Sequence, residues 1–96
     1  MTNQIACNEA GMPVRFLGNT GLEVSIIGFG GGHSVRPDID VQTTVRFIRE
    51  AIDNGVTFMD NAWEYHQGEA ERRMGQALEG RRDRVVLMTK VCARDR

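Results

Sequence analysis

Three side chains that can hold or move a proton stand at the ends of short apolar runs. Asp60 directly follows the run at 56–59, and Tyr65 lies five residues further on. Lys90 comes two residues after a second apolar run at 85–88. A phenol has an ordinary pKa of about 10, so a tyrosine that donates a proton near neutral pH benefits from an ammonium that stabilises its phenolate. Lys90 can be that ammonium, and the Asp60 carboxylate can keep it charged.

Short, β-prone apolar runs mark the strands that must position these side chains. We predict buried strands at residues 25–30, 56–59 and 85–88, because each run is too short for a helix. Glycines end the first run and precede the second. Two further runs at 14–17 and 22–24 surround a glycine-rich turn, which predicts a β-hairpin ahead of the other strands.

Two amphipathic segments separate the predicted strands. Asp40 can cap a helix whose apolar residues recur three and four positions apart over 41–52, and Asn54-Gly55 ends it. A second helix is predicted from Glu69 up to a stop at Gly80. Alternating helices and continuously apolar strands are typical of a parallel sheet covered on both faces, so the fold class is α/β. A (β/α) barrel and a doubly wound sheet both fit, and both place chemistry at the carboxyl ends of the strands.

Length and composition limit the class of protein. The 96 residues allow one small domain, and 41% hydrophobic with 26% charged residues predicts a packed core. A net charge of -1 creates no field of one sign, so neither nucleic acid nor a membrane surface is an expected partner. Neither a membrane span nor a secretory leader is recognisable, so we expect a cytoplasmic protein. Residues 1–12 are predicted to be a flexible lead, with 13–96 as the domain.

Several segments around these side chains resemble the N-terminal part of the aldo-keto reductases. The similar segments follow the family's order and spacing: RFLGNTGLEVS at 15–25, GFG at 28–30, GVTFMDNAWEY at 55–65, GE at 68–69, MGQAL at 74–78 and MTK at 88–90. The resemblance implies a TIM barrel that binds NADPH in an extended conformation and reduces aldehydes or ketones by hydride transfer.

The resemblance also implies a role for each candidate residue. Tyr65 would be the general acid that protonates the carbonyl oxygen, Lys90 would make that phenol more acidic, and Asp60 would be the partner of Lys90. Asp60 is also expected to contact the ribose of the nicotinamide. A loop of small residues would lie against the same part of NADP(H), formed by Gly30, Gly31 and Gly32.

The length of the chain sets the expectation for its own activity. A TIM barrel needs about 200 to 250 residues and eight β/α units. This chain would supply the hairpin, the first three strands and two helices, and a fourth catalytic residue, a histidine, would lie beyond Arg96. We expect the isolated chain to be inactive and to self-associate through the open edge of its last strand. The alternative is a truncated, non-catalytic remnant that acts through self-association or partner binding.

Two residues beside Tyr65 depart from the usual pattern of the family. Asn61 stands where Thr or Ser is usual, and His66 stands where Gly is usual. Because both border Tyr65, the resemblance does not define the shape of the substrate pocket. Trp63, in the same loop, fits two interpretations equally well, a wall of that pocket or a side chain packed under the loop.

Other sites are less well supported. The glycines at 28–32 suggest a dinucleotide-binding G-x-G-x-x-G turn, but His33 replaces the third glycine and Pro37 stands where the phosphate-binding helix should run. His33 and His66 lack cysteine or carboxylate partners at ligand spacing, so no metal is expected. Cys92 is expected to be a buried structural thiol rather than a redox site.

Overall fold

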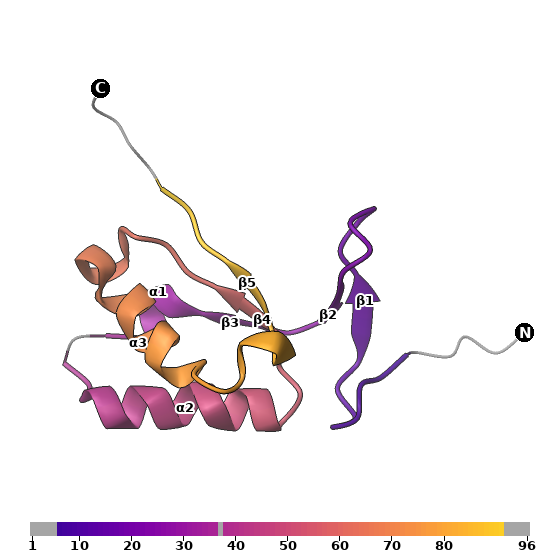
Figure 1. Cartoon of the computed structure of the whole chain (residues 1–96), viewed down its shortest axis with the longest axis horizontal. Coiled ribbons are helices and arrows are strands. Elements are labelled where there is room, and N and C mark those ends of the chain that lie inside the picture. The colour runs from indigo at the N-terminus through magenta and orange to yellow at the C-terminus, as the bar shows by residue number, and fades with distance from the viewer. Residues whose placement is uncertain (1–5, 37, 92–96) are drawn as a thin grey trace, which may run out of the picture.

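The N-terminal hairpin is joined to the rest of the fold by two side chains. A computed structural model of the chain describes residues 6–36 and 38–91. In it, β1 (Val14–Phe16) pairs antiparallel with β2 (Glu23–Ser25), which confirms the predicted hairpin (Figure 1). The Ser25 N–H donates to Thr57 Oγ1 at 2.9 Å, and the Thr57 N–H donates to Ser25 Oγ at 2.9 Å. This reciprocal pair attaches the hairpin to the segment that leads into the central strand of the sheet.

The three remaining strands form one parallel sheet. Its order is β3 (Gly28–Gly30), β4 (Phe58–Asp60) and β5 (Val86–Met88), so each strand lies beside the one before it in the chain. The register places Gly30, Asp60 and Met88 in one row at the carboxyl ends. The predicted parallel sheet is confirmed, and the strand ends that carry the candidate chemistry meet at one edge.

Two main helices pack against this sheet. α2 (Val41–Asp53) begins as predicted, because the Asp40 carboxylate accepts a hydrogen bond of 2.7 Å from the Thr43 N–H. α3 (Glu69–Ala77) ends three residues before Gly80, and a turn completes the segment. Two short helical turns, α1 (Gly31–Ser34) and η2 (Arg82–Arg84), lie between these elements, together with an irregular turn, η1 (Tyr65–Gly68). Among the described residues, no helix is long and apolar enough to cross a membrane.

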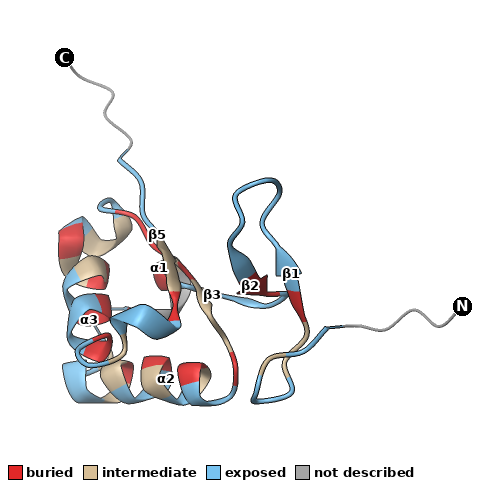
Figure 2. Cartoon of the chain, turned by 45° about the vertical axis from the view of Figure 1, so that its right-hand side comes forward, coloured by how far each residue is buried: buried red, intermediate tan, exposed pale blue. Residues whose placement is uncertain are grey.

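The apolar core lies between the sheet and these helices. The middle residues of the three strands are Phe29, Met59 and Leu87, which lie side by side in the sheet. All three pack into the core on the side of the helices. The buried residues of this apolar core are Val35, Ile48, Ile52, Met59, Ala70, Met74, Ala77, Leu78 and Val85. In Figure 2 the buried segments (red) alternate with exposed ones (pale blue) along α2 and α3. Within the described residues the helices pack on the face that carries Phe29, Met59 and Leu87.

The first strand of the sheet is more exposed than the sequence predicts. The run at 25–30 was expected to be a buried strand, but β3 begins only at Gly28, and Ile26 and Ile27 are 54% and 55% exposed. Within the described residues β3 pairs with β4 alone, so its outer edge has no neighbouring strand. An apolar run signals burial only when both sides of the strand are covered.

Part of the predicted N-terminal lead contacts the domain. The Asn8 side-chain amide donates to the Gly55 carbonyl at 2.8 Å. Gly55 has a φ of +98°, and a Cβ there would lie 2.6 Å from the Cβ of Met12. Glycine is therefore required where this segment crosses the turn between α2 and β4. Residues 1–5 lie outside the described part, and a flexible lead at 1–12 stays a prediction.

A buried arginine ties α3 to the start of α2. Arg73 is 6% exposed, and its guanidinium donates to Glu69 Oε2 at 2.8 Å on its own helix. It also donates to the carbonyls of Arg36 and Ile39, which lie before α2, and to the hydroxyl of Thr44, in the first turn of α2. Arg73 therefore fixes the loop between β3 and α2, which starts at the glycine-rich end of β3.

Acid is expected to weaken this connection. Hydrogen bonds from Arg73, and then from Arg72, lower the pKa of Glu69 below its ordinary value of 4.5. A carboxyl whose pKa is depressed in the folded state stabilises that state above its unfolded pKa, and the contribution is lost as pH falls through the folded pKa. The melting temperature should therefore drop more steeply below about pH 4.5 in the wild type than in Glu69→Gln. Parallel curves for the two proteins would contradict this assignment.

Candidate active site

A lysine and an aspartate meet across two neighbouring strand ends. Asp60 is the last residue of β4, and Lys90 follows β5 by two residues. Lys90 Nζ donates to Asp60 Oδ1 at 2.5 Å and to the Asn61 carbonyl at 2.9 Å. The two side chains are 46% and 38% exposed, so the ion pair lies at an accessible rim rather than in the core.

Tyr65 completes this group from the loop after β4. It is half-buried at the start of η1, and Lys90 Nζ lies 5.2 Å from the centre of its ring. This distance is within the range of a cation–π contact, about 6 Å. The structure thus brings together the three predicted residues Asp60, Tyr65 and Lys90, with Lys90 in contact with the other two.

The charge of Lys90 is held by its partners. The hydrogen bond to Asp60 is the main reason that the pKa of Lys90 is raised above its ordinary value of 10.5, and Tyr65 adds to the same effect. Partial burial acts in the opposite direction but does not outweigh these contacts. Lys90 is therefore an ammonium at neutral pH, placed beside a phenol.

The three glycines predicted to bind a cofactor occupy different surroundings. Gly30 is exposed, sits opposite Asp60 in the register, and has open space where a side chain would be. Gly31 is buried, and a Cβ there would lie 2.8 Å from Asn61 Oδ1. Gly32 lies beside Tyr65, since a Cβ there would be 3.4 Å from the Cζ atom of the ring. Gly30 leaves accessible backbone next to Asp60, which suits a ribose, while the other two shape the loop.

Asn61 faces the interior and does not line the rim. Its side chain is 1% exposed, donates to the Ala70 carbonyl at 3.1 Å and accepts from the Ala62 N–H at 2.9 Å. Its amide therefore packs the strand end against α3. Sequence reasoning missed this because polar residues are buried only where tertiary partners satisfy them.

The neighbouring loop residues differ in their contacts. His66 Nε2 lies 3.1 Å from the Gly32 carbonyl, so this side chain reaches the glycine loop. Trp63 is 55% exposed, and its indole nitrogen would be 3.4 Å from a Cβ at Gly68. Trp63 thus lies on the surface of the loop rather than under it, and its role as a wall of the substrate pocket stays a prediction.

The alternative sites gain no support from the described residues. α1 is a single turn of four residues, far shorter than the helix that a G-x-G-x-x-G motif requires. In the described part of the chain, no cluster of three or more His, Cys, Asp and Glu could hold a metal ion. Pro37 and Cys92 lie outside the described residues.

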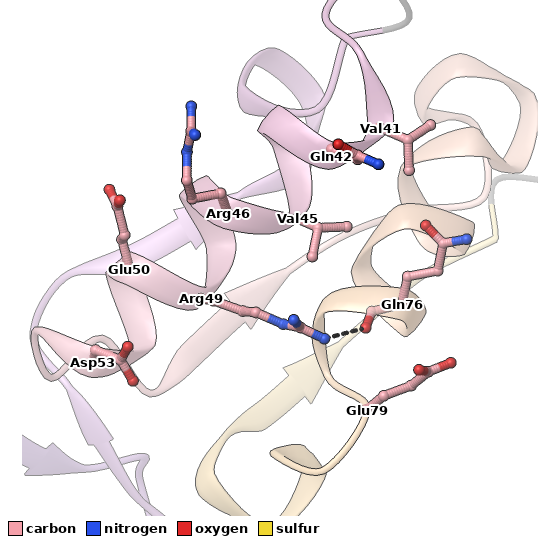
Figure 3. A pocket seen from close by; sticks show the side chains of 9 residues that line it. All are labelled: Val41, Gln42, Val45, Arg46, Arg49, Glu50, Asp53, Gln76 and Glu79. Carbon is pink, nitrogen blue, oxygen red and sulfur yellow. Dashed lines mark hydrogen bonds between the residues drawn. The ribbon is translucent and has the colours of Figure 1, made fainter.

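A surface groove runs along α2 and the end of α3, away from this rim (Figure 3). Arg49 crosses it and donates to the Gln76 and Ala77 carbonyls, both at 3.2 Å. These bonds add side-chain donors to carbonyl groups in the last turn of α3, where the Gln76 carbonyl also accepts from the Glu79 N–H at 3.3 Å. None of the residues that line the groove belongs to the rim with Asp60 and Lys90, so we assign the groove to helix packing.

Comparison with known proteins identifies the family. The model of the aldo/keto reductase family matches residues 26–96. This chain belongs to the aldo/keto reductase family, a family of oxidoreductases. It is 38% identical over 84 residues to aldo-keto reductase YhdN of Bacillus subtilis, covering 82% of this chain and 25% of that protein. A probable voltage-gated potassium channel subunit beta of Arabidopsis thaliana is 37% identical over 83 residues, with 83% and 25% covered.

Solved structures give the same result for the fold. Aldo-keto reductase AKR11C1 from Bacillus halodurans, in its holo form, superposes with a TM-score of 0.78 at 38% identity, covering 88% of this chain and 28% of that one. An aldo-keto reductase from Klebsiella pneumoniae in complex with NADPH gives a TM-score of 0.61 at 42% identity, covering 72% and 24%. The chain spans about a quarter of the length of these relatives. Its α/β fold is therefore the predicted partial TIM barrel.

Proposed function

We propose that this chain carries the proton-donating part of an NADPH-dependent reductase that converts aldehydes or ketones to alcohols. The observation that carries the proposal is the contact of Lys90 with both Asp60 and Tyr65 at adjoining strand ends. When bound, the cofactor supplies the hydride. The chain itself provides a proton donor, a fixed charge and a loop that orients the ligands.

Each residue has one task in the proposed reaction. The Tyr65 hydroxyl gives its proton to the carbonyl oxygen of the substrate as negative charge develops there. The Lys90 ammonium stabilises the phenolate that remains, and Asp60 keeps Lys90 charged and pointed at the ring. The open space at Gly30 leaves room for a ribose beside Asp60, while Gly31 and Gly32 support the same loop. A small carbonyl compound is the proposed substrate, and a cytoplasmic location stays a prediction.

The activity can be tested by completing the barrel. Residues 6–91 would replace the matching segment of the Bacillus halodurans reductase, and oxidation of NADPH would be followed with a panel of aldehydes. We expect turnover in this chimera and none in the isolated chain. A chimera that folds and binds NADPH but gives no turnover with any aldehyde or ketone would contradict the proposal. Sequencing the coding DNA past the codon for Arg96 shows whether the chain itself continues into a barrel.

The second candidate is a non-catalytic remnant that acts through self-association or partner binding. The observation that favours it is the outer edge of β5, which has no neighbouring strand among the described residues. Met88 and Val91, at and beyond the end of this strand, are 38% and 77% exposed. Unpaired strand edges favour pairing with another chain. Sedimentation of the isolated chain should show association that increases with concentration, whereas a monomer with one cooperative thermal transition would count against this candidate.

A further inference from the structure

Two consecutive residues after Tyr65 adopt a backbone conformation that side chains disfavour. His66 has φ 57° and ψ 36°, and Gln67 has φ 55° and ψ 46°. Left-handed backbone is unfavourable for residues with a Cβ, and it persists where the surrounding structure holds it in place. The loop after Tyr65 therefore has a contact that compensates for this conformation.

His66 makes a contact of this kind with the glycine loop. Its Nε2 atom lies 3.1 Å from the Gly32 carbonyl, across 34 residues of sequence. A carbonyl oxygen only accepts hydrogen bonds, so Nε2 must carry a proton, as it does in one neutral tautomer and in the imidazolium. The left-handed turn thus directs the His66 ring back toward the end of β3.

The same glycine loop is held from two further sides. Tyr65 lies in van der Waals reach of Gly32, and Asn61 fills the space beside Gly31. The two positions that depart from the usual family pattern, Asn61 and His66, therefore act on adjacent residues of one loop. The hydrogen bond from His66 couples the backbone of this loop to the segment that carries the proton donor.

We propose that His66 is a positioning residue that fixes the Gly31–Gly32 turn against Tyr65 and thereby sets the spacing between the cofactor loop and the proton donor. The catalytic consequence rests on the function proposed above. The hydrogen bond itself is independent of that function, so the two claims can be tested separately.

The structural claim is tested by amide hydrogen exchange at Val35, whose N–H donates to the Gly31 carbonyl at 3.2 Å. In His66→Phe, which removes the donor but keeps a ring, this amide should exchange roughly three- to tenfold faster. Amides of α2 should not change. The matched control is Gln67→Gly, which relieves the same left-handed backbone without touching Gly32, and it should leave Val35 unchanged or slower. His66→Gln, which retains an N–H donor, should restore part of the protection.

The catalytic claim is tested in the barrel chimera. His66→Phe should raise the Kd for NADPH by roughly three- to tenfold, whereas Gln67→Gly should leave it unchanged. Exchange at Val35 within twofold of the wild type in His66→Phe, in both the isolated chain and the chimera, would overturn the proposal. So would faster exchange with an unchanged Kd for NADPH. A wild-type chimera without turnover would instead contradict the proposed function, and the exchange result would still decide whether His66 holds the loop.

Discussion

Tyr65→Phe is expected to lower kcat for aldehyde reduction in the chimera by about 10²- to 10⁴-fold, the range for loss of a positioned general acid. Phenylalanine keeps the ring beside Gly32 and under Lys90 Nζ, and it removes only the hydroxyl that gives the proton. The Kd for NADPH and the melting temperature should therefore stay close to the wild-type values. Steady-state kinetics together with a cofactor titration separate these quantities.

Trp63→Phe is the matched control for this substitution. Trp63 lies in the same loop and is 55% exposed, and its hydrogen bond to the Lys90 carbonyl comes from its backbone N–H, which the substitution retains. Its replacement should change kcat by much less than Tyr65→Phe does. If Tyr65→Phe kept more than half of the wild-type turnover, the proton would have to come from another group, and the proposed role of Tyr65 would be wrong.

Arg73→Met should lower the free energy of unfolding by about 3 kcal/mol, the low end for breaking a buried ion pair by removing one partner. The low end applies because the Glu69 side chain is 26% exposed and stays partly hydrated. Methionine retains the packing of the aliphatic stem but leaves the carbonyls of Arg36 and Ile39 and the Thr44 hydroxyl without this donor. Urea titrations of wild type and variant at the same protein concentration measure this difference in the free energy of unfolding.

Arg72→Met provides the comparison, since Arg72 binds the same carboxylate from the solvent side. Its side chain is 67% exposed, and its side-chain hydrogen bonds within the described part of the chain go to Glu69 Oε1, at 2.7 and 3.1 Å. Exposed ion pairs contribute little, so this variant should unfold at nearly the wild-type urea concentration. Equal losses in the two variants would show that the stability comes from the Glu69 charge alone and not from the buried network of Arg73.

The elements and the meeting of Asp60 with Lys90 could be predicted because their signals are local. Apolar runs and glycines mark the strands, and Asp40 marks the start of α2. Parallel strands bring their carboxyl ends to one edge, so the positions of Asp60 and Lys90 in the sequence were enough to predict that they meet. The resemblance to the family then added the roles of Tyr65 and of NADPH.

The polar contacts that hold the site could not be predicted in this way. Arg73 occurs in an amphipathic helix, where an arginine four residues after a glutamate is usually a solvated surface pair. It is buried because acceptors 29 to 37 residues away surround it. Asn61 and His66 are similar cases, since their partners Ala70 and Gly32 become neighbours only when the chain has folded. A single sequence gives no direct signal for such contacts.

The strand order of the sheet has a consequence for synthesis of the protein on the ribosome. Because β3, β4 and β5 lie side by side in chain order, each strand can dock on its predecessor as soon as the helix between them has emerged. Elongation at about 5 to 20 residues per second gives each unit of strand and helix a time on the order of seconds to condense. The hairpin can attach at the same stage as the first strand pairing, since its partner Thr57 directly precedes β4. The strand order therefore allows this sheet to assemble in the direction of translation, and among these contacts the ion pair of Asp60 and Lys90 is the last to become available.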